Sequence, residues 1–445
     1  MNHQTDTSGQ SPTAQYKTAK PAIGFWKCWS LTVGMMIGSG VFMLPAVLAP
    51  YGSISFLGWL LTSAGAILFA LILSRLASRT DRTGGPYAYA HDAFGDLVGF
   101  LVAWGYWLGV VFAVTATAVA FAGYAGSIIP VLGANGLTQA LVAAALIWTL
   151  TAININSIGG AASFQLITTI LKLIPLAVIV LLGVFTGSTE NIPPFNPQQL
   201  PAGSALAATA LLTMWAFLGI EACVIPVGDT VDPKRTIPRA VVTGTLSVTV
   251  IYIVVTAAVM MLVPVDVLAT STAPFVDAAK ALGPIGGYLI AFGALVSTAG
   301  SSNANILISG QMPMAAALDG VAPKILADRN KGHAPQFALI VSSVLSTILL
   351  VFNYTDGLIA AFTFLISIST LGTVAAYTLS ACADLKYSWR SARVWAAAAM
   401  IAITYSVIAL LGSGVKIMLW GAVLMALGLP IYFWTKRAKA SAKVA

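Results

Sequence analysis

The stretch Gly34-Met35-Met36-Ile37-Gly38-Ser39-Gly40-Val41-Phe42 places glycines in the middle of a long apolar run. Glycine in a helix interior costs about 1 kcal/mol relative to alanine, and Gly38-Ser39-Gly40 concentrates that cost at one point. This pattern favours a membrane-spanning helix that is broken near its centre. Glycines can also serve only to let neighbouring membrane helices approach closely, and the stretch alone leaves both interpretations open.

The composition of the whole chain indicates that it lies in a membrane. Of its 445 residues only 8% are charged and 58% are hydrophobic, whereas a typical soluble domain carries roughly 25% charged residues. So few charges exclude soluble globular, disordered and nucleic-acid-binding proteins. The three cysteines, Cys28, Cys223 and Cys382, lie far apart, so neither a disulfide framework nor a metal site is expected. We therefore predict an all-α polytopic membrane protein.

Apolar runs long enough to cross a bilayer recur along almost the whole chain. A spanning helix needs about 20 mostly apolar residues, and these runs lack the alternation of a membrane β-barrel. Twelve transmembrane helices are predicted, at 24–49, 54–78, 97–129, 137–155, 162–186, 204–227, 239–263, 285–311, 336–353, 357–382, 392–413 and 415–435. The polar segment 1–20 lacks the layout of a signal peptide and is interpreted as a disordered cytoplasmic tail.

The positive charges orient these spans. With the amino terminus inside and twelve alternating spans, 19 of the 22 Lys and Arg residues fall on one side of the membrane, the others being Lys172, Lys280 and Lys416. Positive residues favour the cytoplasmic side. The net charge of +8 is therefore interpreted as an orientation signal, and both termini are predicted to be cytoplasmic.

A second weak point lies five spans after the first, in Trp215-Ala216-Phe217-Leu218-Gly219-Ile220-Glu221-Ala222. The two segments would enter the bilayer from opposite sides, and interrupted segments at matching positions of two inverted halves indicate the binding site of a secondary transporter. A helix that restarts after Gly40 offers free N–H groups and a positive dipole end to a carboxylate. The opposing unwound carbonyls suit an ammonium group, so a zwitterionic α-amino acid matches both.

Two ionisable residues lie too deep in the predicted spans to reach water easily. Glu221 is the one acid deep in a span, and apolar surroundings should favour its uptake of a proton, so we predict that it couples protonation to transport. Lys172 could bridge its span to the carbonyls of the broken first span, where other carriers hold Na⁺, or could itself carry a proton. Each residue could instead be structural, Glu221 as a protonated hydrogen-bonding group and Lys172 as a fixed cation.

Four motifs in order along the chain resemble a known family. They are Gly38-Ser39-Gly40-Val41-Phe42-Met43-Leu44-Pro45, Thr83-Gly84-Gly85-Pro86-Tyr87-Ala88-Tyr89-Ala90, Trp215-Ala216-Phe217-Leu218-Gly219-Ile220-Glu221 and Asp232-Pro233-Lys234-Arg235-Thr236-Ile237-Pro238-Arg239. Together they resemble the amino acid–polyamine–organocation superfamily, most closely its basic amino acid/polyamine antiporter branch. The resemblance covers essentially residues 24–435.

The resemblance implies a LeuT-type fold, in which two inverted five-helix repeats surround broken helices 1 and 6, and it implies sodium-independent transport. The implied organisation is a single transporter domain at 21–438, with repeat one at 24–186, repeat two at 204–382 and two extra helices at 392–435, followed by a cytoplasmic tail at 439–445. Related antiporters are dimers, so the resemblance also makes a homodimer a candidate assembly.

The same resemblance implies roles for individual residues. The residues that match substrate-binding positions are Ile37, Gly38, Ser39 and Gly40 for the carboxylate, Ala216 and Leu218 for the amino group, and Trp215, Asn305 and Ser369 for the rest of the pocket. Tyr106, Trp215 and Tyr377 match gating positions, and Glu221 matches the proton-sensitive carboxylate of the branch.

Three departures from the branch concern its substrate. Met35 and Val114 stand where asparagines are expected, and Asn305 replaces a tryptophan that stacks on a guanidinium group. Lys172 instead resembles the lysine of proton-dependent, broad-specificity amino acid transporters elsewhere in the superfamily. Specificity for arginine or agmatine therefore does not follow from the resemblance.

The sequence thus predicts a secondary amino acid transporter of the cell inner membrane that exchanges a basic amino acid for its amine by alternating access. It has no Walker motif, catalytic triad or metal-ligand cluster, so an enzyme, a cofactor and a metal are not expected. Its expected partners are an amino acid or amine and the lipid bilayer, with no nucleic acid. The alternatives are a proton-coupled symporter of neutral amino acids and a non-transporting receptor or scaffold, whereas Lys172 disfavours a sodium symporter.

Overall fold

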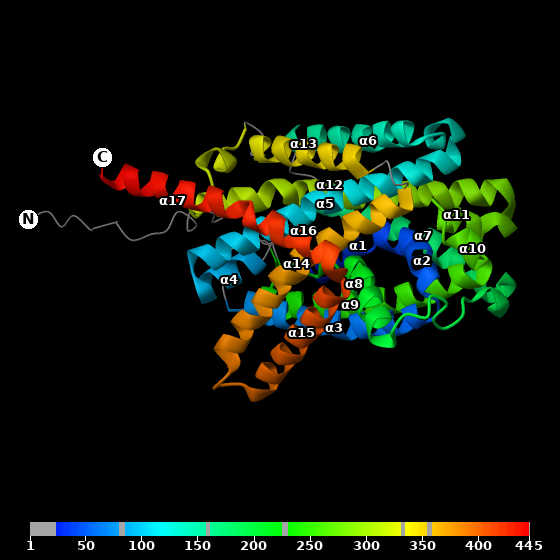
Figure 1. Cartoon of the computed structure of the whole chain (residues 1–445), viewed down its shortest axis with the longest axis horizontal. Coiled ribbons are helices and arrows are strands. Elements are labelled where there is room, and N and C mark those ends of the chain that lie inside the picture. The colour runs from blue at the N-terminus through cyan, green and yellow to red at the C-terminus, as the bar shows by residue number, and fades with distance from the viewer. Residues whose placement is uncertain are drawn as a thin grey trace, which may run out of the picture.

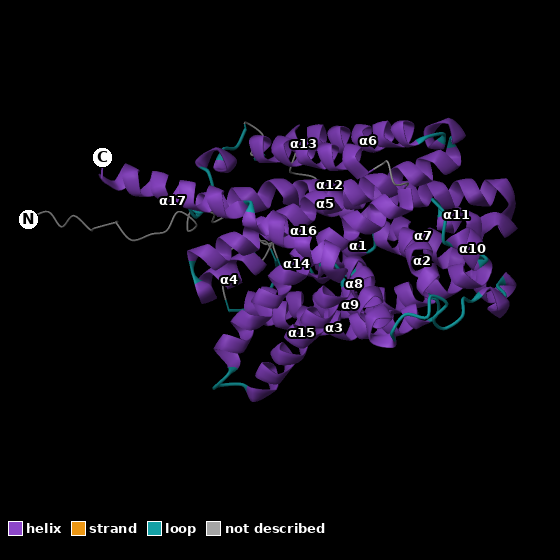
Figure 2. Cartoon of the chain, in the orientation of Figure 1, coloured by secondary structure: helices purple, strands orange, loops and turns teal. Residues whose placement is uncertain are grey.

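The computed structural model describes residues 24–79, 85–156, 161–224, 230–330, 334–353 and 358–444. These residues are almost entirely helical and form no β-strand (Figure 1, Figure 2). The α-helices are α1 (Phe25–Met36), α2 (Ser39–Leu48), α3 (Ile54–Ala77), α4 (Pro86–Phe94), α5 (Asp96–Ile128), α6 (Gly136–Asn156), α7 (Ala161–Thr186), α8 (Ala202–Ala216), α9 (Pro233–Leu262), α10 (Val265–Leu268), α11 (Pro274–Ala278), α12 (Gly283–Leu318), α13 (Gln336–Asn353), α14 (Leu358–Ser388), α15 (Arg393–Gly412), α16 (Gly414–Ala426) and α17 (Gly428–Val444). The short 3-10 helices are η2 (Ala49–Tyr51), η3 (Pro130–Gly133), η4 (Thr189–Asn191), η5 (Ile220–Cys223), η7 (Ala279–Leu282) and η8 (Lys324–Ala327).

Eleven helical segments among the described residues are long and apolar enough to cross a membrane. They correspond to eleven of the twelve predicted spans. The remaining one, 336–353, coincides with α13, whose apolar part Gln336–Phe352 is shorter than the others. The prediction of an all-α polytopic membrane protein is therefore confirmed, while the count of twelve spans stays a prediction.

The carboxyl-terminal helix runs further than expected. α17 continues to Val444, through the segment predicted as a tail at 439–445. The residues after 435 are mostly Ala and Lys, which are good helix formers, and none is Gly or Pro. The predicted tail at 1–20, and Thr83 and Gly84 of the second motif, lie outside the described residues.

The two predicted broken spans lie in the interior of the bundle, whereas other spans cover them. In the most apolar windows of Phe25–Tyr51 and Ala202–Cys223, 89% and 83% of the residues are buried, against 17% in Gly136–Asn156 and 17% in Gly414–Arg437. Helix α5 runs through the centre and packs against α12 and α14 (Figure 1). The exposed helices are apolar outside, which suits a protein whose surroundings are lipid tails.

Close contact between α5 and α14 depends on glycine. A Cβ atom on Gly109 of α5 would lie 2.9 Å from the carbonyl oxygen of Ser369, and one on Gly372 of α14 would lie 2.5 Å from that of Gly105. Small residues let membrane helices approach until their backbones touch. This contact sets the position of Ser369 relative to the central helix.

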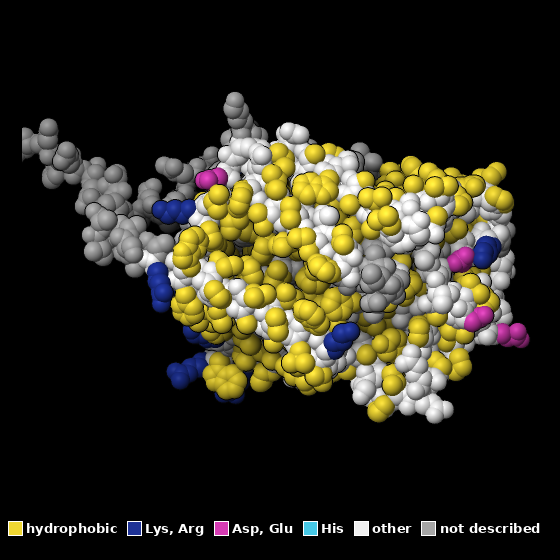
Figure 3. Space-filling view, turned by 45° about the horizontal axis from the view of Figure 1, so that its top comes forward, with side chains coloured by type: hydrophobic (Ala, Val, Ile, Leu, Met, Phe, Trp, Pro, Cys, Tyr) yellow, Lys and Arg dark blue, Asp and Glu magenta, His cyan; other side chains and the backbone are white. Residues whose placement is uncertain are grey.

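Most of the charged side chains on the visible surface lie at the two ends of the long axis. Figure 3 shows a wide yellow band of hydrophobic side chains, with most of the visible Lys and Arg at the end from which α17 extends. Helices α10 and α11 lie at the opposite end (Figure 1). An apolar band between two polar ends is the surface expected of a membrane-embedded bundle.

Candidate functional site

The first predicted break is present between α1 and α2. Helix α1 ends at Met36 and α2 begins at Ser39, leaving Ile37 and Gly38 outside both helices. A Cβ atom on Gly38 would collide with the side chain of Ser301 on α12. Any larger residue at this point must therefore move α12 or the broken span.

The second break follows α8. This helix ends at Ala216, and the chain resumes as the 3-10 helix η5 from Ile220. Between them Gly219 has φ 107°, in the left-handed region that residues with a side chain rarely adopt. A Cβ atom on Gly219 would also lie 2.8 Å from the Cβ atom of Met35 on α1, so the two breaks touch each other. Residues 225–229, which follow η5, lie outside the described residues.

A cavity lies where the two breaks meet. Its volume is about 40 Å³, which is enough to hold a few water molecules. Of the residues predicted from the sequence, those that line it are Gly38, Ser39, Gly40, Tyr106, Trp215, Ala216, Leu218, Glu221, Asn305 and Ser369. Ile37, Lys172 and Tyr377 are not among its lining residues. The structure thus gathers most of the predicted site from α2, α5, α8, α12 and α14.

Glu221 is held by three hydrogen-bond donors. Tyr106 Oη on α5 donates to its Oε1 at 2.5 Å, Tyr377 Oη on α14 donates to its Oε2, and the Gly219 N–H donates to Oε2 at 3.1 Å. Its surroundings are therefore less apolar than the sequence suggested. An ionised carboxylate accepts from all three groups, because it is an acceptor only. Since Tyr377 lies behind Glu221 and outside the cavity lining, it reaches the site through that carboxylate.

The first turn of α2 faces the cavity without a cap. No side chain caps this end of the helix, and the first N–H groups of any α-helix lack partners within it. Ser39 is only 1% exposed and lines the cavity, yet its Oγ finds no hydrogen-bond partner among the described residues. A helix amino terminus with a free hydroxyl beside it suits a negatively charged group.

Lys172 lies beneath the first break and outside the cavity. It is 0% exposed on α7, and its Nζ donates to the carbonyl oxygen of Gly34 on α1 at 2.9 Å. The side chain therefore bridges α7 to the broken span, as the sequence suggested it could. Ile37, which was assigned to the substrate carboxylate, is fully buried next to α12, where its carbonyl oxygen accepts from Ser297 Oγ at 3.4 Å.

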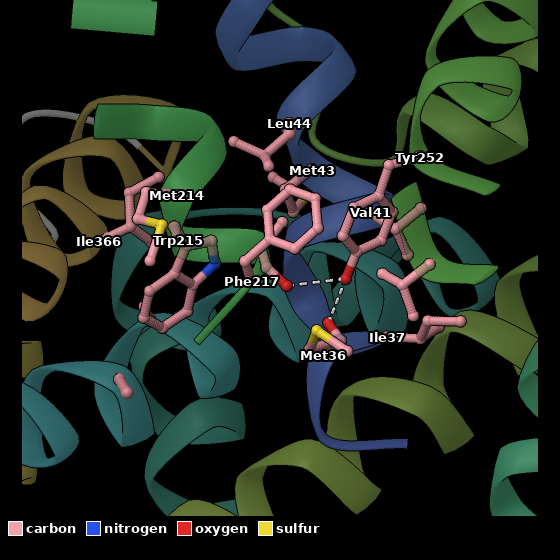
Figure 4. Close-up of a cluster of buried hydrophobic side chains, with 14 of the residues drawn as sticks. Met36, Ile37, Val41, Met43, Leu44, Met214, Trp215, Phe217, Tyr252 and Ile366 are labelled. Carbon is pink, nitrogen blue, oxygen red and sulfur yellow. Dashed lines mark hydrogen bonds between the residues drawn. The ribbon is translucent and has the colours of Figure 1, made fainter. Parts of the chain in front are cut away.

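The carbonyl ends of the two broken helices converge on one tyrosine. Tyr252 of α9 donates to the carbonyl oxygen of Met36 at 2.5 Å and to that of Ala216 at 2.8 Å. Figure 4 shows its hydroxyl between the two carbonyl groups, with Phe217 beside its ring. The sequence analysis missed Tyr252, because it stands in an apolar run with no polar neighbour to mark it.

Other residues around the cavity were also missed. Val110 and Ala113 of α5, Ile308 of α12 and Thr373 of α14 line it, whereas Val114, the position compared with a pocket asparagine, does not. These residues are small or apolar, and only their helical spacing relative to Tyr106, Asn305 and Ser369 could have indicated them. No group of three His, Cys, Asp or Glu residues in the described parts of the chain could hold a metal ion.

Comparison with known proteins places the chain in a family. The model of the amino acid permease family matches residues 23–434. The chain is 33% identical to the "Putative arginine/ornithine antiporter" of Bacillus subtilis (strain 168), over 82% of this chain and 84% of that protein. It is 32% identical to the cadaverine/lysine antiporter of Escherichia coli (strain K12), over 74% of each chain. It is 30% identical to the putrescine transporter PotE of the same organism, over 90% of this chain and 93% of that protein.

The family model spans nearly all of the described helices, both breaks and the cavity between them. The resemblance inferred from the four motifs is thereby confirmed, and so is the prediction that the protein is no enzyme. The chain belongs to the amino acid permease family of membrane transporters, in its branch of basic amino acid/polyamine antiporters.

Proposed function

We propose that the protein exchanges an amino acid for an amine across the cell inner membrane, by alternating access to the cavity between the two breaks. The observation that carries this proposal is the pairing of opposite helix ends around one small cavity. The uncapped start of α2 offers N–H groups and Ser39 Oγ, and the last residues of α1 and α8, Met36 and Ala216, line the same cavity. A molecule with a carboxylate and an ammonium group complements both ends.

Within this function, Gly38, Ser39 and Gly40 bind the substrate carboxylate, with Ile37 shaping the turn from behind. Backbone around Ala216 and Leu218 binds the amino group, while Trp215, Asn305 and Ser369 bound the space left for the side chain. Tyr106, Trp215 and Tyr377 act as gates. The supporting observation is that Tyr106 and Tyr377 join α5 and α14 to the second break through Glu221.

Glu221 and Lys172 are proposed to make transport sensitive to protons. Protonation places an O–H donor on one oxygen of Glu221, so the tyrosine at that oxygen must turn its own hydroxyl to accept or separate from it. Proton uptake would therefore rearrange the hydrogen bonds that join Tyr106, Tyr377 and the Gly219 N–H to this carboxyl group, and so loosen the second break. The ammonium group of Lys172 lies beside the Gly34 carbonyl oxygen, where it would take the place of a bound sodium ion. This arrangement supports sodium-independent transport.

The proposed membrane architecture has twelve spans, with α13 as the ninth, and two inverted five-helix repeats followed by two extra helices. Both termini are proposed to be cytoplasmic, and the assembly a homodimer. The supporting observations are the matching positions of the two breaks and the gathering of Lys and Arg at the end from which α17 extends (Figure 3).

The names of the relatives favour a basic amino acid and its amine as substrates. A second candidate is proton-coupled symport of a neutral amino acid. One observation favours it: Glu221 is the one charged side chain among the lining residues, and three donors already engage it. A cationic side chain in this cavity would have no free carboxylate to pair with.

Purified protein in liposomes tests these functions. Vesicles are loaded with arginine, ornithine, lysine, agmatine, cadaverine, putrescine, alanine or leucine, and uptake of each labelled compound is followed. Exchange predicts uptake only into vesicles that contain a counter-substrate. Uptake into empty vesicles under an imposed proton gradient would reject obligate exchange and favour symport, and no uptake under either condition would reject both.

A further inference from the structure

A group of arginines lies where α3 and α14 end and α15 begins. These three helices pack against one another, and the turn between α14 and α15 projects at the left end of the bundle in Figure 1, the end from which α17 extends. The group, here called the arginine corner, consists of Arg75 in the last turn of α3, Arg79 just after that helix, Arg390 in the turn after α14, and Arg393 at the start of α15. The proposed function assigns no role to it.

Arg75 is already paired with an acid. Its Nη1 donates to the two carboxylate oxygens of Asp384 on α14 at 3.0 and 2.9 Å, and to Ser388 Oγ at 2.5 Å. The Asp384 side chain is 0% exposed, and the Arg75 guanidinium lies 4.8 Å from the centre of the Trp395 ring of α15. This buried carboxylate therefore neutralises Arg75 and is not free to balance the other three arginines.

Those three arginines carry charge that no acid balances. Arg79, Arg390 and Arg393 are exposed, and none of them forms an ion pair with a residue that the structure describes. The Arg79 guanidinium lies 6.0 Å from the centre of the Tyr387 ring on α14. Since Arg390 follows Tyr387 by three residues and Arg393 precedes Trp395 by two, chain connectivity keeps their Cα atoms within roughly 11 and 7 Å of those aromatic residues. Like charges gathered in this way repel each other, and an anion between them relieves the repulsion.

Neighbouring charges do not cancel the surplus. Lys386 on α14 is engaged with α4, where its Nζ donates to the carbonyl oxygen of Ala93 at 2.6 Å. Asp92, the acid next to Ala93, lies 3.6 Å from His91, between Oδ1 and Nδ1. Among the described residues, the corner and these neighbours therefore set four arginines and Lys386 against two carboxylates, those of Asp384 and Asp92.

The surface beside the corner is apolar and suited to lipid. Trp389 is 61% exposed and Val394 is 81% exposed, and only 33% of the residues in the most apolar window of α15 are buried. Tryptophan is enriched at the level of the lipid headgroups. The exposed arginines thus lie at the depth of lipid phosphates, next to side chains that suit acyl chains.

We propose that the arginine corner binds the headgroup phosphate of one anionic phospholipid through Arg79, Arg390 and Arg393, with Trp389 and Val394 against its glycerol and acyl chains. A guanidinium group donates two parallel hydrogen bonds to a phosphate, and basic groups between membrane helices bind anionic headgroups. A free phosphate ion matches the charge but covers neither apolar side chain, so the lipid complements more of this surface. The bound lipid connects α3 to α14 and α15.

Native mass spectrometry of the purified full chain in detergent tests this proposal. Dioleoyl phosphatidylglycerol, which is anionic, and dioleoyl phosphatidylcholine, which has the same chains and no net charge, are titrated separately, and the Kd of the first bound lipid is measured. The wild type should bind the phosphatidylglycerol at least about tenfold more tightly, and Arg79→Gln, Arg390→Gln and Arg393→Gln should each raise that Kd about fivefold. Equal Kd values for the two lipids in the wild type would overturn the proposal.

The matched control for total charge is Lys234→Gln/Arg235→Gln/Arg239→Gln at the start of α9. These three residues are likewise exposed, and they are predicted to lie on the same side of the membrane as the corner. Their replacement removes as much charge as Arg79→Gln/Arg390→Gln/Arg393→Gln, yet it should change the Kd of phosphatidylglycerol less than about twofold, because distant exposed charges are screened. A loss of affinity equal to that of the corner variant would show that any basic group serves, and would reject a site at the corner.

Two further arms separate a lipid from an ion, and charge from folding. Inorganic phosphate in excess should not displace the phosphatidylglycerol, and displacement would assign the corner to a soluble anion instead. Arg79→Lys/Arg390→Lys/Arg393→Lys keeps the charge and should bind the lipid more tightly than the glutamine variant, so equal losses would contradict recognition by charge. If a triple variant does not fold, the single variants decide, because each replaces one exposed side chain, and an unchanged Kd in all three would overturn the proposal.

Discussion

The two breaks at the centre of the molecule differ in what they leave unpaired. At the first break, the start of α2 has no cap and Ser39 Oγ has no partner within the described structure. At the second, Glu221 turns back onto the Gly219 N–H, and its oxygens are engaged by Tyr106 and Tyr377. One break is thus open to a ligand, and the other is satisfied by its own neighbours.

This difference suggests that the two breaks have different tasks in the proposed transport cycle, the first in binding the substrate and the second in controlling movement. Free N–H groups at a helix start are suited to bind a carboxylate, whatever side chain the substrate carries. A carboxylate held by two tyrosines from α5 and α14 instead ties the second break to helices on the far side of the cavity. In the function proposed above, the first break would bind the carboxylate that all amino acids share, and Glu221 at the second break would respond to protons and closure.

The largest expected effect comes from tying the two broken spans together below the cavity. Cys28 on α1 and Cys223 on η5 are both fully buried, on two elements that pack against each other. If the breaks act as hinges, α1 must separate from η5 when the cavity opens on this side. Aerobic copper phenanthroline, which takes two electrons and two protons from the thiol pair, should form a disulfide and arrest every cross-linked carrier.

The assay uses a Cys382→Ser background, so that the disulfide can form only within this pair. Exchange should fall in proportion to the cross-linked fraction and recover on reduction, while Cys28→Ser and Cys223→Ser resist the oxidant. Full activity of the cross-linked carrier would show that α1 and η5 move as one body.

The next effect distinguishes the reasons for glycine at the two breaks. In Gly38→Ala the new Cβ collides with Ser301, and displacement of the binding backbone should lower exchange about 100-fold. Because the colliding atoms belong to the Ser301 side chain, the double variant Gly38→Ala/Ser301→Gly should regain most of the activity. Transport by each variant is measured per folded carrier in proteoliposomes.

Gly219→Ala provides the contrast. Here Met35→Gly removes the close Cβ atom, but the φ of 107° still disfavours alanine, so no comparable recovery is expected. Equal rescue at both positions would contradict the distinction between a steric requirement at the first break and a conformational one at the second.

The sequence alone predicts the first break better than the second, because the features of the first break are local in the chain and those of the second are not. The clustered glycines predicted the first break, and Gly38, Ser39 and Gly40 line the cavity. Glu221 was conspicuous as a charge in a span, but its two tyrosine donors came only through resemblance, because they lie 115 and 156 residues away along the chain. Tyr252 had no local signal, since its role depends on where α1 and α8 end in space.

A smaller effect is expected from the acid at the second break. Glu221→Gln keeps the shape of the side chain and removes the ionisable group, and because the amide NH2 only donates, one of the two tyrosines must turn its hydroxyl to accept or lose its hydrogen bond. Exchange should fall about tenfold, the cost of one or two weakened hydrogen bonds, and its dependence on pH should flatten. Rates are compared from mildly acidic to mildly alkaline pH at equal pH on both sides of the membrane. A variant that keeps the pH profile of the wild type would remove Glu221 from proton sensing.

The smallest effect tests whether the first break is open to a ligand. Ser39→Ala removes a hydroxyl that has no protein partner in the described structure, so folding should not suffer and only the bond to the substrate carboxylate is lost. KM should rise about fivefold with Vmax unchanged. Ser63→Ala on α3 is the matched control, because Ser63 Oγ is likewise buried without a partner there but does not line the cavity. If both variants leave KM unchanged, the free hydroxyl of Ser39 is no part of the carboxylate site, and recognition at the first break falls to the backbone of α2 alone.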